Sequence, residues 1–263
     1  MDIRYSIHDL DDNLTPTKDE FKTTEYYAGI AEWAHFIYRA NDPNNLLVPP
    51  IGLWTGREES IVRAFFDRAL PRPNSISGVE SCAVYINLAS GYKRYNPLLK
   101  PEVWELFREI KARAIPVLLN EVENLKLYEG GKEICIAIER YNPNVPIKQY
   151  LPSVKSVLKD YLEYVDIDCS SIAVDIKPKG VNKGAGLVTF TEETGVDPEY
   201  ILGSGDSASD VPMLERVKYA VCPANADDAC MACVRSKGED YGHVSEYRYV
   251  TGVIDGMKRF GIA

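Results

Sequence analysis

The chain has 263 residues, of which 45% are hydrophobic and 26% are charged, with a formal net charge of −9. These values are typical of a globular protein with one large domain or two smaller ones. Nucleic-acid and anionic-membrane surfaces need clustered lysine and arginine, so the acidic balance argues against both partners but allows a small anionic substrate. No apolar run approaches the ~20 residues of a membrane-spanning helix, and the first ten residues lack the apolar core of a signal peptide. We therefore expect a cytoplasmic protein.

The cysteine pattern favours a reducing compartment. Six cysteines are scattered along the chain, at positions 82, 135, 169, 222, 230 and 233. Cys230 and Cys233 form a CxxC pair, but no second pair follows at zinc spacing and the surrounding run is typical of a helix. We therefore expect buried thiols without a metal or redox role.

The first predicted element is a short strand over residues 3–7, which ends in a group of acidic residues. In an open parallel α/β sheet the ligand crevice lies beyond the carboxyl ends of the strands, so Asp9 would project into it. A carboxylate held there can attack phosphorus and form an aspartyl phosphate. Asp11 could protonate the leaving oxygen and later activate water. His8 should point away from the site because side chains alternate along a strand.

The next elements continue an alternation of helices and strands. Apolar periodicity predicts a helix over 18–39, a strand over 48–54 and a helix over 58–70. The second strand runs into Thr55, Gly56 and Arg57.

The sequence pattern changes near residue 84, where long polar loops begin to separate the predicted elements. Predicted helices at 101–126 and 147–164 are interleaved with strands at 133–140 and 171–176, without further catalytic-looking residues. We interpret residues 84–177 as an inserted α+β cap, a lid that selects the substrate.

Strict alternation returns in the last third. The predicted elements there are a helix at 182–194, strands at 200–203 and 219–222, and helices at 211–216, 226–234 and 250–260. Such alternation builds a parallel sheet covered on both faces. The predicted fold class is therefore α/β: residues 1–83 and 178–263 form a doubly wound, Rossmann-like core, interrupted by the cap.

Four stretches thus meet at predicted strand ends, and each suits phosphoryl transfer. Lys183 supplies positive charge, Thr55 a hydroxyl and Gly56 a backbone N–H to a phosphate. An all-oxygen set that suits Mg²⁺ comes from Asp9, Asp206, Asp210 and the carbonyl of Asp11. Arg57 could either contact the substrate or brace the Asp9 loop by a salt bridge.

These motifs resemble the haloacid dehalogenase (HAD) superfamily of phosphatases, and more closely its Cof-type and sucrose-phosphate-phosphatase-like branch with a large α/β cap. The resemblance covers residues 1–83 and 175–263, with strong motifs DIKPKGVNKGAGL, ILGSGDSASDVPML and YVTGVIDGMKRFG. It implies that Asp9 is the nucleophile and a metal ligand, and that Asp11 is the acid/base residue whose carbonyl also binds metal. Thr55 and Lys183 would hold and neutralise the phosphoryl group, and Asp206 and Asp210 would bind Mg²⁺, the latter directly or through water.

The chain departs from the family pattern at three positions. Asp12 and Asn13 stand where the first motif has Gly and Thr, and Ser209 stands where Asn is common in the last motif. We expect loss of the threonine hydroxyl to loosen Asp9 and Asp11, leaving activity reduced but present.

Three functions follow from these observations. The first is a Mg²⁺-dependent phosphatase acting on a small phosphomonoester, most simply a sugar phosphate, through an aspartyl phosphate on Asp9. The second is a phospho-ligand-binding or regulatory module without turnover, and the third is a phosphosugar mutase. The sequence leaves the natural substrate, the cap residues that contact it and the oligomeric state open.

Overall fold

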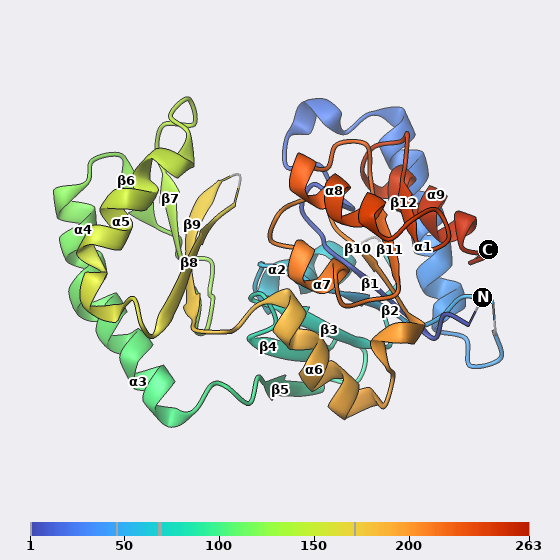
Figure 1. Ribbon diagram of the computed structural model, residues 1–263, viewed down its shortest axis with the longest axis horizontal. Coiled ribbons are helices and arrows are strands. Elements are labelled where there is room, and N and C mark those ends of the chain that lie inside the picture. The colour runs from blue at the N-terminus through green and yellow to red at the C-terminus, as the bar shows by residue number, and fades with distance from the viewer. Residues whose placement is uncertain (1, 46, 68–69, 171, 263) are drawn as a thin grey trace. The chain divides into compact units, whose positions relative to one another are not determined.

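The computed structural model describes every residue except 1, 46, 68–69, 171 and 263 (Figure 1). Its contacts divide the chain into two compact units. The core unit consists of residues 1–94 and 182–263, and the inserted unit consists of residues 95–181.

A five-stranded sheet forms the centre of the core unit. Every neighbouring pair in it is parallel, and its order is β12 (Gly242–Val244), β11 (Tyr219–Cys222), β10 (Ile201–Ser204), β1 (Tyr5–His8) and β2 (Ile51–Leu53). All residues of the middle strands β11, β10 and β1 are buried, as expected where helices cover both faces. The predicted doubly wound parallel sheet is confirmed.

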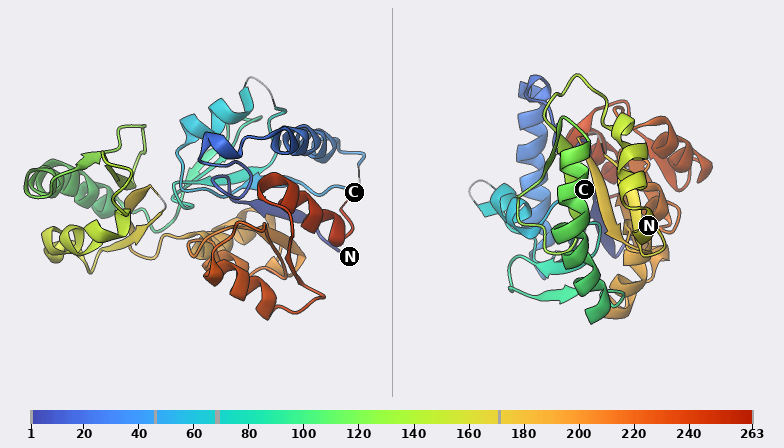
Figure 2. Two further views of the ribbon diagram at one scale, coloured as in Figure 1. Left: turned by 90° about the horizontal axis from the view of Figure 1, so that it is seen from above. Right: turned by 90° about the vertical axis from the view of Figure 1, so that its left-hand side faces the viewer.

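Helices cover this sheet on both faces. One face carries α1 (Thr24–Ala40) packed beside α9 (Tyr249–Arg259), whereas α7 (Val211–Leu214) and α8 (Asp228–Ser236) lie on the opposite face (Figure 2). The helix α6 (Lys183–Thr194) packs against α7. The remaining helical elements of this unit are α2 (Glu59–Asp67) and the 3₁₀ turns η1 (Asp19–Phe21) and η5 (Pro198–Tyr200).

A second, three-stranded sheet extends the core unit after β2. Its order is β3 (Ile76–Val79), β4 (Val84–Asn87) and β5 (Lys93–Tyr95), and β3 pairs antiparallel with β4. A bridge from Trp54 to Gly78 joins this sheet to the end of β2. The insert was expected to begin at residue 84, but this pairing places β4 in the core unit.

The inserted unit is a four-stranded antiparallel sheet with helices. The sheet order is β6 (Leu125–Leu127), β7 (Ile136–Arg140), β9 (Ala173–Pro178) and β8 (Val165–Cys169). Its helical elements are α3 (Pro101–Glu109), the π-helical η2 (Ile110–Ala114), α4 (Ile115–Glu121), η3 (Ile147–Tyr150), α5 (Leu151–Val157) and η4 (Lys159–Tyr161).

Two predicted helices of the insert are wrong in their extent. The helix expected over 101–126 is interrupted by η2 and ends at Glu121. Pro116 explains the interruption, because it lacks the N–H that an α-helix needs and its ring crowds the preceding turn. The helix expected over 147–164 stops at Val157 and is followed by η4 and strand β8.

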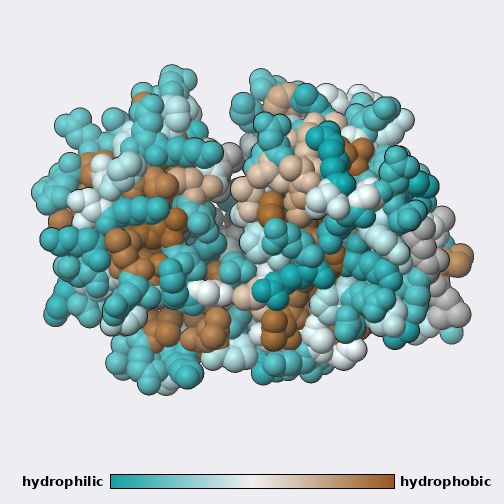
Figure 3. Space-filling model, in the orientation of Figure 1, coloured by the Kyte–Doolittle hydropathy of each residue, from teal (hydrophilic) through white to brown (hydrophobic). Residues whose placement is uncertain are grey.

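Large apolar side chains reach solvent in both units, for example Tyr38 in the core unit and Tyr141 in the inserted unit. On the face drawn in Figure 3, small groups of hydrophobic residues are surrounded by hydrophilic ones. No helix in the described part of the chain is long and apolar enough to cross a membrane.

Candidate active site

The site begins where two neighbouring parallel strands end. His8, the last residue of β1, pairs in register with Ser204, the last residue of β10. The N–H of Asp9 donates to the carbonyl of Ser204 at 3.0 Å, so the loops after these strands start side by side. Residues almost 200 positions apart in the chain therefore meet, at the edge where open α/β sheets bind ligands.

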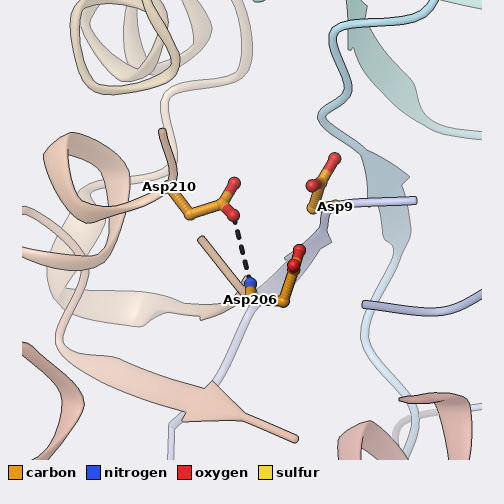
Figure 4. Close-up of side chains that lie close together, drawn as sticks. All are labelled: Asp9, Asp206 and Asp210. Carbon is orange, nitrogen blue, oxygen red and sulfur yellow. Dashed lines mark hydrogen bonds between the residues drawn. The ribbon is translucent and has the colours of Figure 1, made fainter. Parts of the chain in front are cut away.

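Three aspartates converge at this edge. Carboxylate oxygens of Asp9, Asp206 and Asp210 all lie within 4.8 Å of one another. Figure 4 shows Asp9 at the end of β1, Asp206 in the loop after β10 and Asp210 at the start of α7. Asp9 is 7% exposed and Asp210 is fully buried, so solvent screens this negative charge poorly.

Lys183 joins two of these aspartates. Its ammonium lies 2.8 Å from Oδ1 of Asp9 and 2.5 Å from Oδ1 of Asp210, and its side chain is 4% exposed. Asn182 caps the helix that begins at Lys183 by accepting the N–H of Ala185, which fixes the start of α6. Burial alone would lower the pKa of Lys183, but Asp210 and Asp9 raise it above its ordinary value.

One lysine does not offset three carboxylates. Burial raises the pKa of Asp9 to about 7, although contact with Lys183 lowers it. Burial, followed by repulsion from Asp210 and Asp9, raises the pKa of Asp206 to about 10. A further cation would favour the charged form of both groups, and carboxylate oxygens are the ligands that Mg²⁺ prefers. The donor set therefore fits a divalent metal ion.

Asp210 also holds the loop that carries Asp206. Its Oδ2 accepts the backbone N–H groups of Asp206 and Ser207, each at 3.1 Å, and the hydroxyl of Ser207 at 3.2 Å. Ser209, where the family pattern has Asn, contacts the hydroxyl of Ser207 at 2.9 Å. Both oxygens of Asp210 are thus engaged by protein donors.

Asp11 forms a two-pronged pair with Arg57. Nε of Arg57 donates to Oδ2 at 2.7 Å and Nη2 donates to Oδ1 at 2.9 Å. The salt bridge proposed for Arg57 therefore exists, and it joins the loop after β1 to the segment after β2.

Thr55 and Gly56 lie between β2 and Arg57. Thr55 is fully buried, and its hydroxyl accepts the N–H of Arg57 at 3.1 Å. A Cβ atom at Gly56 would have Oγ of Ser81 as its nearest neighbour, 3.9 Å away, so crowding within the protein does not require glycine there. Because Leu53 pairs in register with His8, these residues leave the sheet beside Asp9.

A strained turn packs against this segment, and sequence reasoning missed it. Glu80, Ser81 and Cys82 have φ angles of 49°, 58° and 69°, a region that non-glycine residues rarely adopt. The N–H of Glu80 donates to the carbonyl of Arg57 and that of Ser81 donates to the carbonyl of Thr55. The turn contains no Gly or Asn that would have signalled this conformation.

The departures in the first motif do not leave its loop unsupported. Asp12 has a φ of 54°, where the family pattern has glycine, and its carboxylate accepts the N–H of Thr17. Asn13 was expected to leave Asp9 and Asp11 more loosely held than the family's threonine would. The structure instead shows a bond to Asp9, because Nδ2 of Asn13 donates to the carbonyl of Asp9 at 2.9 Å. The side chain of Asn225 donates to the carbonyl of Asp12 at 2.6 Å.

Asn225 and Asp227 are further residues that sequence reasoning missed. Oδ1 of Asn225 accepts the N–H of Tyr249, another left-handed residue, with a φ of 52°. Asp227 caps α8 and also accepts the N–H of Ala208, while its own N–H donates to the carbonyl of Asp206. The run Asn-Ala-Asp-Asp signals a helix start, but only the tertiary structure joins it to both acidic loops.

Two other sequence features have structural explanations. His8 is fully buried with its ring edge-to-face with Trp33, consistent with its predicted orientation, and burial lowers its pKa to about 3. Cys230 is buried in α8 with its thiol against the carbonyl of Gly205, and contact with Cys222 and burial raise its pKa. Both Cys230 and Cys233 are free thiols.

A family model for haloacid dehalogenase-like hydrolases matches residues 120–235, which include Lys183, Asp206 and Asp210. The matched segment, a little under half of the chain, is similar to that family. Asp9 lies outside the matched segment, but the structure brings it into contact with Lys183.

Relatives of this HAD-like chain include two archaeal proteins named phosphoglycolate phosphatase. The one from Methanopyrus kandleri is 33% identical over 129 residues, which are 48% of this chain and 49% of the relative. The one from Methanobrevibacter smithii is 31% identical over 101 residues, which are 38% and 40% of the two chains. The match thus spans about half or less of these relatives.

Solved structures share the whole fold at lower identity. A protein of Thermoplasma acidophilum superposes with a TM-score of 0.70 at 18% identity, covering 99% of both chains. The sucrose-phosphatase of Synechocystis, solved with sucrose and phosphate, superposes with a TM-score of 0.70 at 16% identity, covering 99% of this chain and 98% of its own. At these identities the likeness shows a common fold.

Proposed function

We propose that this HAD-like chain is a Mg²⁺-dependent phosphatase that hydrolyses a small phosphomonoester through an aspartyl phosphate on Asp9. The observation that carries the proposal is the contact of Lys183 with both Asp9 and Asp210, beside Asp206. A buried ammonium against a carboxylate at a strand end supplies both a nucleophile and compensation for an incoming phosphate dianion. The match of residues 120–235 to the family model and the names of the relatives support the same reaction class.

The nucleophile is prepared by its contacts. Lys183 engages Oδ1 of Asp9, which favours the ionised form and orients the carboxylate. Oδ2 of Asp9 then attacks phosphorus, the bond from phosphorus to the leaving oxygen breaks, and Lys183 offsets the charge of the transferred group. Thr55 and the backbone N–H of Gly56 hold the phosphoryl oxygens.

Asp11 supplies the proton for the leaving oxygen and then takes one from the attacking water. A carboxyl group that donates a proton cannot keep both oxygens bonded to a guanidinium, so the pair with Arg57 must loosen during the reaction. The freed guanidinium would then be available to the substrate, so Arg57 has both predicted roles in turn.

Mg²⁺ would be held by Asp9, Asp206 and the carbonyl of Asp11, and when bound it would neutralise negative charge on the phosphate. Asp210 contributes by holding the Asp206 loop and Lys183, because its oxygens are already engaged. Of the two roles predicted for Asp210, this favours the water-mediated one.

The substrate class remains a small phosphorylated metabolite, and a sugar phosphate is one proposal within it. The named relatives point to two kinds of ester: phosphoglycolate phosphatases suggest a small phosphorylated acid, and sucrose-phosphatase suggests a phosphorylated sugar. We assign the choice between these two kinds of ester to the inserted unit, whose sequence has longer polar loops than the core.

The test is a panel of 2-phosphoglycolate, sugar phosphates and p-nitrophenyl phosphate with Mg²⁺, using wild type, Asp9→Asn and the exposed control Asp19→Asn. We expect phosphate release by wild type and the control, and none above background with Asp9→Asn, because an amide is a poor nucleophile. Equal rates for wild type and Asp9→Asn would overturn the proposal. Phosphorus NMR of the products separates hydrolysis from the transfer that a mutase would catalyse.

A further inference from the structure

Three buried polar side chains form a hydrogen-bonded series that ends on the backbone of Asp9. They are His8 at the end of β1, Ser204 at the end of β10 and Asn13 in the loop that carries Asp9, and each is fully buried. Nδ1 of His8 lies 2.8 Å from Oγ of Ser204, and Nδ2 of Asn13 lies 2.8 Å from the same hydroxyl. Nδ2 of Asn13 also lies 2.9 Å from the carbonyl of Asp9.

The carbonyl of Asp9, at the end of this series of hydrogen bonds, sets which atom donates in each of them. A carbonyl only accepts, so the side-chain nitrogen of Asn13 must face Asp9, and its second proton goes to the hydroxyl of Ser204. The hydroxyl then has its own proton to give to Nδ1 of His8. Asn13 thus uses both amide protons, whereas the threonine of the family pattern has only one hydroxyl proton to donate.

This series of hydrogen bonds holds both peptide groups of Asp9, the proposed nucleophile. The N–H of Asp9 donates to the backbone carbonyl of Ser204, and the carbonyl of Asp9 accepts from Asn13, which is itself bonded to the side chain of Ser204. Both sets of bonds lead to Ser204, so this one residue of the neighbouring strand fixes the position and tilt of the Asp9 backbone. A carboxylate on a backbone held at both ends has fewer orientations available.

This arrangement is a costly way to fill the core. Oδ1 of Asn13 and Nε2 of His8 are buried without a hydrogen-bond partner in the described part of the chain. Burying an unsatisfied polar group disfavours folding, whereas apolar side chains of similar size would pack there without that penalty. Destabilising features such as buried polar atoms without partners are most common at sites where function requires them.

We propose that His8, Ser204 and Asn13 are positioning residues that orient Asp9 for attack and for metal binding. The inference rests on the phosphatase function proposed above and extends it to residues that do not touch the substrate. It also gives the Asn13 departure a role: the asparagine replaces the family's threonine and is coupled to Ser204 and His8.

The experiment is a double-mutant cycle of Asn13→Ala, Ser204→Ala and the double variant, with Asn13→Thr as a milder change. The control is Ser6→Ala, which removes a buried hydroxyl on the same strand that has no hydrogen-bond partner in the described structure. For each protein we would measure kcat and KM with p-nitrophenyl phosphate, Mg²⁺ affinity by calorimetry, and thermal unfolding.

Each single variant should lower kcat at least about tenfold with little change in KM, because a displaced nucleophile slows chemistry more than it weakens binding. Mg²⁺ should bind several-fold more weakly, and the double variant should be little worse than Asn13→Ala because the residues act as one unit. Asn13→Thr should fall between Asn13→Ala and wild type.

Variants that are less stable than wild type but keep the kcat and Mg²⁺ affinity of Ser6→Ala would overturn the inference, since a purely structural role changes only stability. If Asn13→Ala does not fold, Asn13→Thr and Ser204→Ala decide the question by the same measurements. Absence of Asp9-dependent turnover in wild type would instead refute the proposed function. In that case the Mg²⁺ affinities from calorimetry would still report whether His8, Ser204 and Asn13 orient Asp9.

Discussion

The two units treat buried charge in opposite ways. In the core unit one ammonium, that of Lys183, lies among three carboxylates, and the partners it contacts are at most 9% exposed. In the inserted unit lysines pair with carboxylates near the surface, as in Lys177 with Asp168 at 2.6 Å and Lys132 with Asp175 at 3.0 Å.

This difference separates a charge arrangement that the fold needs from one that a ligand completes. Strands β8 and β9 place Asp166 opposite Lys177 and Asp168 opposite Asp175, and the ammonium of Lys177 reaches across to Asp168, the diagonal neighbour. This pair joins one cation to one carboxylate and needs no added ion to complete it. The core cluster has an excess of negative charge, which burial makes costly unless a cation joins it. Unbalanced buried charge is therefore the stronger sign of a functional site.

The largest difference between the units is expected when one lysine is removed from each. Lys183→Met should lower kcat/KM by about 10³-fold, because it removes the ammonium that faces the phosphate. It should also lower the free energy of unfolding by about 3 kcal/mol, because it leaves buried carboxylates unpaired.

The matched change, Lys177→Met, should cost about 1 kcal/mol or less and leave kcat unchanged, because its partner Asp168 is 55% exposed. Chemical unfolding and steady-state kinetics on both variants check this. A comparable loss of activity in the two variants would erase the distinction between the units.

Metal binding gives the next largest effect. Mg²⁺ at a hundred times its dissociation constant should stabilise wild type by about 2.7 kcal/mol, seen as a rise in the unfolding midpoint. Asp206→Asn should abolish that rise and also stabilise the metal-free protein, because it removes a carboxylate whose charged form the metal-free fold disfavours. Asp168→Asn in the insert should leave the Mg²⁺ effect intact. A full Mg²⁺ response in Asp206→Asn would place the ion elsewhere.

The pair of Asp11 with Arg57 offers a finer probe within the core unit. Arg57→Met should lower kcat by about tenfold, because Asp11 loses its two-pronged partner and the substrate loses a cation. Arg57→Lys keeps the charge but not the paired geometry, so it should recover only part of the activity. Full activity in Arg57→Met would show that neither role is needed.

The smallest effect is expected at a partly exposed carboxylate of the core unit, that of Asp255 between β12 and α9. Asp255 accepts from His243 and from Ser245, each at 2.7 Å, and although burial opposes the shift these contacts lower its pKa. A group with a lowered pKa stabilises the fold above its unfolded pKa and loses that contribution as pH falls through its folded value.

Asp255→Asn should therefore cost about 0.5 kcal/mol at pH 7, and the difference from wild type should disappear as pH falls below about 3.8. Urea unfolding across this pH range measures it. A deficit that persists in acid would mean that the carboxylate charge is not its cause.

Much of the core could be predicted because its signals are local. Strand β11 has the predicted bounds, and α6 begins within one residue of its predicted start, since buried strands and helix caps are marked by adjacent residues. The insert was harder: the predicted helix over 101–126 runs into strand β6, and strand β8 was not predicted, because short strands at a sheet edge have weak periodicity. The strands β3, β4, β5 and β12 were also missed, and residues 80–82 adopt a conformation that their side chains do not signal.

The acidic groups at the ends of the parallel strands could be identified from the residues alone, because strand direction and motif spacing place Asp9 and Asp206 at one edge of the sheet. Lys183 could be recognised from its motif and from the Asn cap of its helix. Only the tertiary structure decided how those groups are held. The contact of Lys183 with Asp210, the pair of Asp11 with Arg57 and the bond between His8 and Ser204 join residues 27, 46 and 196 positions apart. Register and burial set such contacts, and neither leaves a periodic trace in the residues nearby.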